Sequence, residues 1–111
     1  RKVSTRFARK VQKVKICFTI GANQISDAEE KIVFMQLIDA NGRLIQGKEN
    51  IEVNVSDSIF NCTTYSTFNY QNIEMNNCFE WERVQQLESG IYLVNLIIEG
   101  RVAGQQTFKL R

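Results

Sequence analysis

The sequence of 111 residues contains no histidine and no proline. Without an imidazole group the chain cannot form a Ser-His-Asp or Cys-His nucleophile, a histidine proton shuttle or a histidine-ligated metal site. Proline commonly protects the edge strands of β-rich proteins, so lysines such as Lys13, Lys15 and Lys109 would have to serve instead. These absences remove the commonest catalytic groups, and we expect a protein that is not an enzyme, with no cofactor and no small-molecule substrate.

Cysteine is scarce as well. Cys17, Cys62 and Cys78 lie too far apart for a CxxC zinc or redox motif, and their odd number excludes a complete disulfide framework. At most one pair can form a bond, and Cys62 and Cys78 enclose a loop short enough to close at low entropic cost. The other interpretation, which we favour, is that all three act as isolated, small apolar side chains.

Long apolar stretches are absent too. The chain has no run of 18 apolar residues that could cross a membrane, and no signal peptide at its start. It begins with Arg1 rather than methionine, so we expect it to be a piece of a longer protein. Its length fits one domain that can bury roughly two thirds of its unfolded surface. A content of 43% hydrophobic and 23% charged residues is that of an ordinary globular protein.

The net charge of +2 conceals a strong asymmetry. Seven of the 14 basic residues lie within the first 15 positions, while the chain from Asp27 onward has seven basic and twelve acidic residues, a net charge of −5. The basic segment could neutralise nucleic-acid phosphates, approach anionic lipid, or project from the wet face of a first strand beside acidic neighbours such as Glu49 and Glu52. We favour the last interpretation and expect no nucleic-acid partner, because no nucleic-acid motif accompanies the charge.

Periodicity predicts β-strands along most of the chain. Residues 11–20 alternate between apolar and polar side chains, as in a half-buried strand, and residues 32–38 form a nearly continuous apolar run typical of a central strand. Further strands are expected at residues 51–55, 62–70 and 78–81, and a C-terminal hairpin at residues 91–99 and 102–110.

Turn signals complete the predicted fold. Asn41-Gly42 predicts a tight turn with a return at residues 43–45, and residues 80–88 are a weak helix candidate. The spacing of strands and turns predicts an all-β fold, an immunoglobulin-like antiparallel β-sandwich of about seven or eight strands. Residues 1–10 form a basic lead-in that could add an edge strand, and residues 11–111 form the single sandwich domain.

Three stretches together resemble a known family. Residues 5–23 (TRFARKVQKVKICFTIGAN) resemble the first strand of a C-terminal domain found in Bacteroidetes envelope proteins, and residues 33–44 (VFMQLIDANGRL) resemble a hairpin of that domain. The third stretch combines residues 65–70 (YSTFNY), 78–81 (CFEW) and 87–92 (LESGIY). The order and spacing of these motifs carry the resemblance, which covers nearly the whole chain.

The resemblance implies a location and a broad role. In such proteins a transmembrane helix and a coiled coil precede the domain, which implies a membrane-tethered, extracytoplasmic β-sandwich in the periplasm or cell envelope. Ala40 departs from the family, which has proline at this place in the turn. The family carries no catalytic or binding residue that can be transferred. It therefore implies a structural or protein-interaction domain, with a protein partner or self-association, that reaches the membrane only through the upstream segment.

A weaker resemblance provides an alternative. Residues 37–44 and 87–94 are similar to motifs of the C-terminal sorting domains recognised by the type IX secretion system of the same phylum. Those domains usually place the two motifs closer together. The long segment between them here, residues 46–86, and the matching first strand favour the anchored envelope protein.

Only a few residues are candidates for a functional surface. Clustered basic groups and exposed tyrosines provide contact area at interfaces. The predicted interaction surface consists of Lys10, Lys13, Lys15, Tyr65 and Tyr70.

Other prominent side chains are expected to serve the fold. We expect Phe68, Trp81 and Tyr92 in the core, with Trp81 as the central tryptophan of such sandwiches. Glu80 and Glu82 are the best-placed pair of carboxylates for catalysis, but we expect them to be solvated.

A calcium site is the one metal site that the acidic residues suggest. Asp27, Glu29 and Glu30 could supply loop carboxylates, but they lack the DxDxDG spacing. We therefore expect a solvated loop and no metal site.

Overall fold

The computed structural model describes residues 11–21 and 29–111, and every regular element within them is a β-strand. The strands are β1 (Lys13–Ile20), β2 (Glu29–Ile38), β3 (Ile51–Val55), β4 (Ser58–Cys62), β5 (Thr64–Tyr70), β6 (Met75–Glu82), β7 (Gly90–Ile98) and β8 (Arg101–Leu110). All of their pairings are antiparallel. The predicted all-β fold is therefore confirmed. Residues 1–10, the predicted lead-in and extra edge strand, lie outside the described residues.

β1 and β6 form a two-stranded sheet. The predicted alternation of β1 is confirmed, because Ile16 and Ile20 are buried while Lys13 and Lys15 are exposed. On β6, Trp81 is buried in the same core. The small sheet therefore has one apolar face that packs and one face in contact with water, as is common for antiparallel sheets.

β2 lies inside a four-stranded sheet with the order β5-β2-β7-β8. Its inner face carries Val33, Met35 and Leu37, which are each at most 1% exposed. On its outer face Phe34 packs against Ile97 and the β3–β4 hairpin. Burial on both faces explains why β2 has a nearly continuous apolar sequence rather than an alternating one.

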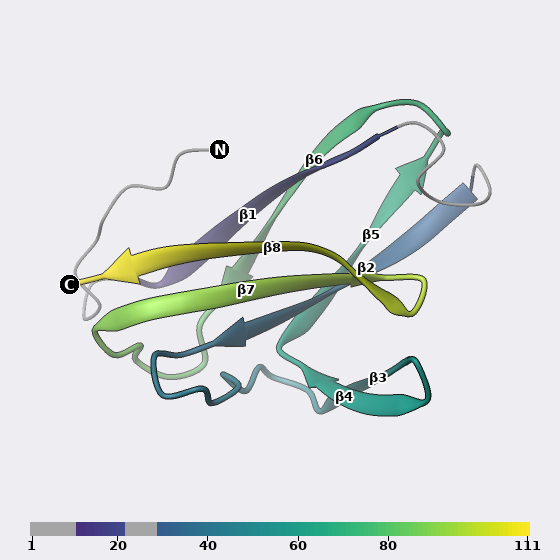
Figure 1. Cartoon of the computed structure of the whole chain (residues 1–111). Helices are drawn as coiled ribbons and strands as arrows, with labels where there is room; N and C mark the ends of the chain where they lie inside the picture. The colour runs from purple at the N-terminus through teal and green to yellow at the C-terminus, as the bar shows by residue number, and fades with distance from the viewer. Residues whose placement is uncertain (1–10, 22–28) are drawn as a thin grey trace.

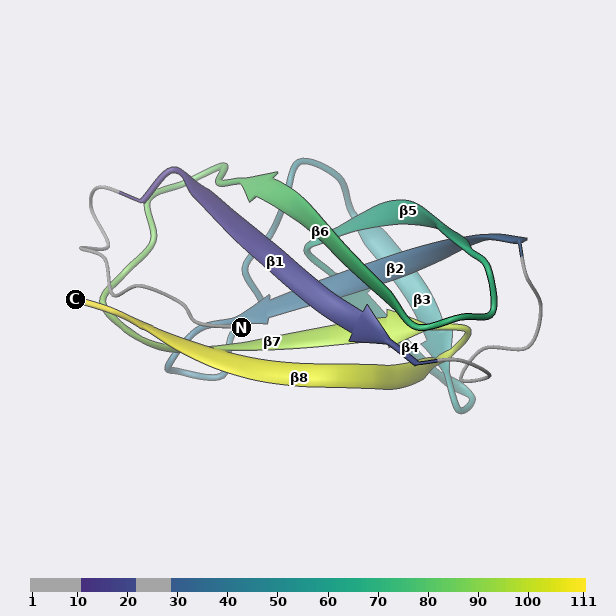
Figure 2. The same cartoon turned by 90° about the horizontal axis from the view of Figure 1, so that it is seen from above.

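The two sheets pack face to face. Figures 1 and 2 show β1 and β6 crossing above the four-stranded sheet, with the β3–β4 hairpin beneath it. The core between the sheets includes Ile16, Trp81, Met35, Tyr92 and Leu96. β1 and β6 take the places of strands B and E of an immunoglobulin-like sandwich, and β2, β7 and β8 take those of C, F and G. The predicted architecture is therefore confirmed.

The β3–β4 hairpin adds a layer on the outer face of the large sheet. Val55 and Cys62 pack against Ile97 of β7. The strands are joined at Ser56 and Asp57, which have φ angles of 50° and 68°, and consecutive positive φ angles are typical of tight hairpin turns. The sequence predicts β3 but not β4, because Ser-Asp is a weaker turn signal than Asn-Gly.

The Asn41-Gly42 turn is confirmed, although its return is shorter than predicted. Gly42 has a φ angle of 80°, which glycine adopts without steric cost, and its N–H donates to the carbonyl oxygen of Asp39 at 3.0 Å. Instead of a strand at residues 43–45, the return has a single bridge between Leu44 and Ile38.

The segment after β6 is irregular, so the helix considered for residues 80–88 is wrong. This segment is fixed by Leu87 and Tyr92, which are 2% and 1% exposed. The Tyr92 hydroxyl donates to the carbonyl oxygen of Glu88 at 2.7 Å and accepts from the Glu88 N–H at 2.9 Å. Burial raises the pKa of Tyr92. This tyrosine corner is typical of strand F in immunoglobulin-like sandwiches, and it satisfies both backbone groups of Glu88 without a helix.

Replacing Tyr92 with phenylalanine should lower the free energy of unfolding by about 1–3 kcal/mol, because the backbone N–H and C=O of Glu88 lose their partner. Urea unfolding of the two proteins measures the difference. The matched control is Tyr65→Phe, which removes the same group from an exposed ring and should cost less than about 0.5 kcal/mol. Equal losses in the two variants would contradict the role of the tyrosine corner.

Candidate functional site

A disulfide joins the two strands of the small sheet. Cys17 of β1 and Cys78 of β6 lie directly opposite each other, with Cα atoms 4.1 Å apart and a bond between their sulfurs. The prediction of three isolated cysteines is therefore wrong, and Cys62 is not the partner of Cys78. The register of β1 and β6 explains the pairing, because it brings together residues 61 positions apart. Such bonds typically stabilise a fold by about 2–4 kcal/mol.

Cys62 is a free and fully buried thiol. It packs under the β3–β4 hairpin against Ile97, so it behaves as the small apolar side chain that was expected of all three cysteines. Burial raises the pKa of this thiol, which makes it a poor nucleophile.

The solvent-facing side of the small sheet carries the disulfide and a ladder of opposite charges. Lys13 lies opposite Glu82, and Lys15 lies opposite Glu80. All four side chains are exposed, so the two glutamates are solvated as predicted. Cross-strand pairs of this kind are favourable. The acidic neighbours expected beside the lysines are therefore present, but they come from β6 rather than from residues 49–52.

A buried lysine lies at the start of β2. Lys31 is 7% exposed, and its Nζ is 2.7 Å from an oxygen of Glu99 and 3.0 Å from one of Glu29. Hydrogen bonds to Glu99 and then to Glu29 raise the pKa of Lys31. Its contribution to stability is therefore complete below the unfolded pKa of about 10.4 and is lost as pH rises through the higher folded pKa. These ion pairs tie β2 to the β7–β8 turn.

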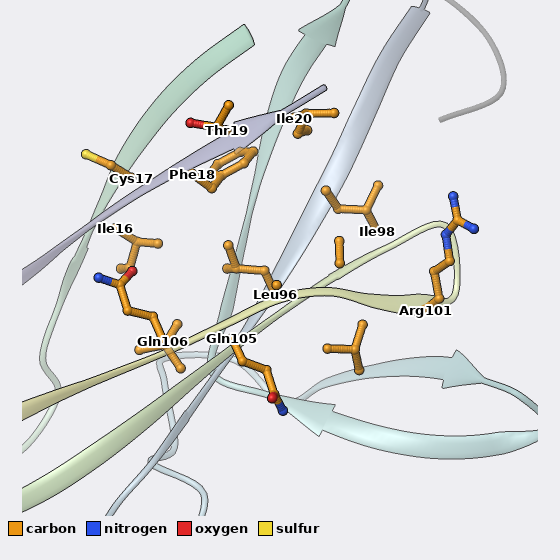
Figure 3. Close-up of a pocket in the computed structure, with 14 residues that line it drawn as sticks. Ile16, Cys17, Phe18, Thr19, Ile20, Leu96, Ile98, Arg101, Gln105 and Gln106 are labelled. Carbon is orange, nitrogen blue, oxygen red and sulfur yellow. The ribbon is translucent and has the colours of Figure 1, made fainter. Parts of the chain in front are cut away.

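An open groove runs between β1 and β8. β1 pairs only with β6 and β8 pairs only with β7 among the described residues, so each lies at the edge of its described sheet. The groove has a volume of about 590 Å³. Its floor is apolar: Figure 3 shows Ile16 and Ile20 of β1 on one side, and Leu96 and Ile98 of β7 on the other. The side chain of Cys17 points away from it (Figure 3), in agreement with the alternation of β1.

The rim of this groove is polar, and Arg101 is the charged residue among those that line it. β1 and β8 also contain Lys13, Lys15 and Lys109, which do not line the groove, and neither strand contains an acidic residue. Gly104 leaves space in the wall formed by β8, because a Cβ atom at this position would meet no atom within 4 Å. The groove thus combines an apolar floor, the edges of two strands and a partly polar rim.

The residues predicted to form an interaction surface do not come together. Lys13 and Lys15 lie on the outer face of the small sheet, whereas Tyr65, which is 48% exposed, lies on the outer face of the large sheet. Tyr70 is 1% exposed, so its assignment to the surface is wrong. The alternation of β5 places it on the inner face. Lys10 lies outside the described residues.

The expected core aromatics are confirmed, but the groove was not predicted. Phe68, Trp81 and Tyr92 are all buried. Trp81, however, lies on β6, in the place of strand E, so it is not the central tryptophan that such sandwiches carry on strand C. The residues of β8 that line the groove, such as Gly104 and Gln106, did not stand out in the sequence. The available signal was weak: β8 lacks acidic residues and has a glycine where an apolar side chain would continue the alternation.

The described residues contain no cluster of three or more histidine, cysteine or acidic side chains that could hold a metal ion. Of the residues considered for calcium, Glu29 bonds to Lys31, Glu30 is exposed, and Asp27 is outside the described part of the chain. A search of the same residues finds no helix long and apolar enough to cross a membrane.

Comparison with known proteins places the chain in a family. Residues 1–111 match the sequence profile of a family described as a domain of unknown function (DUF8428). The chain belongs to this family. No curated protein and no solved structure matches the chain. Membership of DUF8428 brings no function with it, so the functional argument depends on the geometry of the fold.

Thiol labelling under three conditions should distinguish the cysteines. Iodoacetamide should modify no cysteine of the native protein rapidly, because Cys62 is buried and the other two are bonded. After unfolding without a reductant it should modify Cys62 alone, and after reduction it should modify all three. Mass spectrometry counts the labels and locates them. Recovery of a Cys62–Cys78 peptide would contradict the observed pairing.

Reversing one charge pair tests the ladder on the small sheet. Lys15→Glu places two carboxylates opposite each other and should lower the free energy of unfolding by about 0.5–1 kcal/mol. The second substitution, Glu80→Lys, restores opposite charges and should recover most of this loss in urea unfolding. A double variant no more stable than Lys15→Glu alone would show that the charges do not interact.

Proposed function

We propose that the chain is a non-enzymatic protein-interaction domain of a membrane-tethered, extracytoplasmic protein. The observation that carries the proposal is the groove between β1 and β8, where two strand edges flank an apolar floor (Figure 3). Natural β-proteins usually cover or blunt such edges, because they can pair with another chain. An open edge beside apolar side chains is suited to binding a second polypeptide.

The disulfide supports a location outside the cytoplasm. Cys17 and Cys78 lie on the solvent-facing side of the small sheet, and Cys78 is exposed. Cytosolic thiol systems keep most cysteine pairs reduced, whereas disulfides persist in the periplasm and at the cell surface. The membrane tether and the upstream coiled coil are supported by the resemblance of residues 5–23 and 33–44 to envelope proteins.

The charge of β8 favours a different protein over a second copy. Pairing of two β8 edges would bring together strands that each carry Arg101 and Lys109 and no acidic residue. Like charges across a strand pair are destabilising, and basic residues on edges are a common device against self-pairing. We therefore place a protein partner before self-association.

In-cell photo-crosslinking of the full-length protein tests this function. A photoreactive amino acid at Val102, which is 46% exposed and lines the groove, should form an adduct with a single envelope protein. The matched control is Ile59, which is 67% exposed on the β3–β4 hairpin and should give no adduct.

Three results would overturn the proposed function. They are adducts with nucleic acid alone, the absence of protein adducts from Val102, and export of a reporter fusion followed by cleavage of the domain from it. The last result would assign the chain to secretion sorting instead.

A further inference from the structure

We infer that the disulfide of the small sheet is a site of thiol–disulfide exchange, at which a dithiol protein attacks the sulfur of Cys78 and Cys17 leaves as a thiolate. This inference goes beyond the proposed function, because it does not depend on the groove or on what binds there. It is carried by three features of the described residues: the face on which the bond lies, the unequal exposure of the two cysteines, and the charges beside them.

The disulfide lies on the face of the small sheet that does not pack in the core. The two bonded cysteines are opposite each other in the register of β1 and β6. Their neighbours on this face are the cross-strand pairs Lys15–Glu80 and Thr19–Asn76, whose four side chains are all exposed. No described strand covers the bond (Figure 2). A second protein can therefore reach it, and exposed disulfides are commonly the labile or regulatory ones.

The two cysteines differ in how easily they can be reached. Cys78 is exposed, whereas Cys17 is half-buried. The rate of exchange depends on which sulfur is attacked and on access to it. Cys78 is therefore the residue whose sulfur an attacking thiolate reaches more readily.

The charges beside the bond favour the same products. Lys15 lies two residues before Cys17, and Glu80 lies two residues after Cys78, each on the same face as its cysteine. Side chains two positions apart on a strand are about 7 Å apart. Lys15 forms no ion pair with another described residue, so its ammonium group is available to stabilise a thiolate on Cys17. A thiolate on Cys78 would instead lie beside the carboxylate of Glu80.

One effect acts in the opposite direction. Glu80 repels an attacking thiolate as it approaches Cys78. In water, two unit charges about 7 Å apart change a rate by less than about threefold, and salt screens the effect further. Access therefore decides which sulfur is attacked, and the charges decide which thiolate persists.

The reaction is a two-electron reduction in two steps. One thiolate of the dithiol protein forms a bond to the Cys78 sulfur, the Cys17–Cys78 bond breaks, and its electron pair goes to the Cys17 sulfur, which later takes a proton from water. The second thiolate of the dithiol protein then attacks the first at the mixed disulfide and releases Cys78, which is protonated in turn. The dithiol protein is oxidised to a disulfide, and the domain gains two thiols.

A thioredoxin whose second active-site cysteine is replaced by serine tests the inference on the intact chain, because it stops at the mixed disulfide. Iodoacetamide then caps the thiol that has left, and mass spectrometry locates both modifications. We expect thioredoxin on Cys78 and the label on Cys17 in at least about ten times the amount of the reverse product. The variant Cys62→Ala should give the same products, because the free thiol of Cys62 is buried.

Two lysine variants form a matched pair that tests the role of charge. Lys15→Gln removes the ammonium group beside Cys17 and should lower the yield of the mixed disulfide by about two- to threefold. Lys13→Gln removes the same charge four residues from Cys17 and should have a smaller effect, because salt screens distant exposed charges. Both side chains are exposed, and circular dichroism confirms that the variants are folded.

Hydrogen exchange measures what the reaction does to the fold. A two-stranded sheet is marginally stable, so after reduction β1 and β6 depend on the packing of one face alone. Their amides should exchange at least about tenfold faster in the reduced protein, and those of β2 and β7 should change by a smaller factor.

Four results would overturn the inference or one of its steps. Thioredoxin attached mainly to Cys17, or equally to both cysteines, would contradict the assignment of the attacked sulfur. A reaction that occurs only after unfolding in urea would show that the native bond is inaccessible. Equal effects of Lys15→Gln and Lys13→Gln would remove the charge argument, and equal changes in exchange across both sheets would show that the bond does not act on the small sheet in particular. None of these results bears on crosslinking from Val102, so the proposed function can stand or fail separately.

Discussion

A two-stranded sheet cannot hold its shape in water by itself, and this constraint governs the whole domain. β1 and β6 persist as a sheet because their apolar faces, with Ile16, Ile20 and Trp81, pack on the four-stranded sheet. The disulfide between Cys17 and Cys78 joins the strands on the opposite face, where no strand of the described residues covers them (Figure 2). Packing on one side and a covalent link on the other together make the small sheet stable.

The difference in width between the sheets has a functional consequence. Among residues 11–21 and 29–111, two strands packed on four leave the sandwich open along one side, between the edges of β1 and β8. The floor of this opening is apolar, and Arg101 is the charged residue among those that line it. By contrast, the outer face of the large sheet is partly covered by the β3–β4 hairpin, which packs on Ile97. The groove is therefore a place where the described part of the fold presents both the edges of strands and an apolar surface.

Most strands could be predicted because burial imposes a period on the sequence. Alternation along β1 follows from one buried face, and the apolar run of β2 follows from two. The tyrosine corner lies within residues 87–92, which stood out in the sequence only for their resemblance to a known family. The hydrogen bonds between Tyr92 and Glu88 could be found only in the structure. The missed strand β4 begins after a turn in which Ser56 and Asp57 adopt positive φ angles. The dipeptide Ser-Asp predicts such a turn less strongly than Asn-Gly does.

The features that could not be predicted depend on the register between strands and on the position of each strand within its sheet. Cys17 meets Cys78 across 61 positions only because β1 and β6 align in one of several conceivable registers. The sequence did not show which face of β5 packs in the core, so the burial of Tyr70 could not be predicted. The groove required knowing that β8 ends the large sheet and that β1 lies at the edge of the small one. A single sequence does not contain this information in a local pattern.

Hydrogen exchange along β8 in the isolated domain tests the central claim, that this strand has an accessible edge, most directly. Amides of β2 and β7, and those of β8 bonded to β7, should exchange slowly because they lie inside the sheet. The amides of β8 that do not bond to β7, apart from that of Gln106, should exchange faster. Uniformly slow exchange along β8 would contradict the account, because it would show that the edge is already paired.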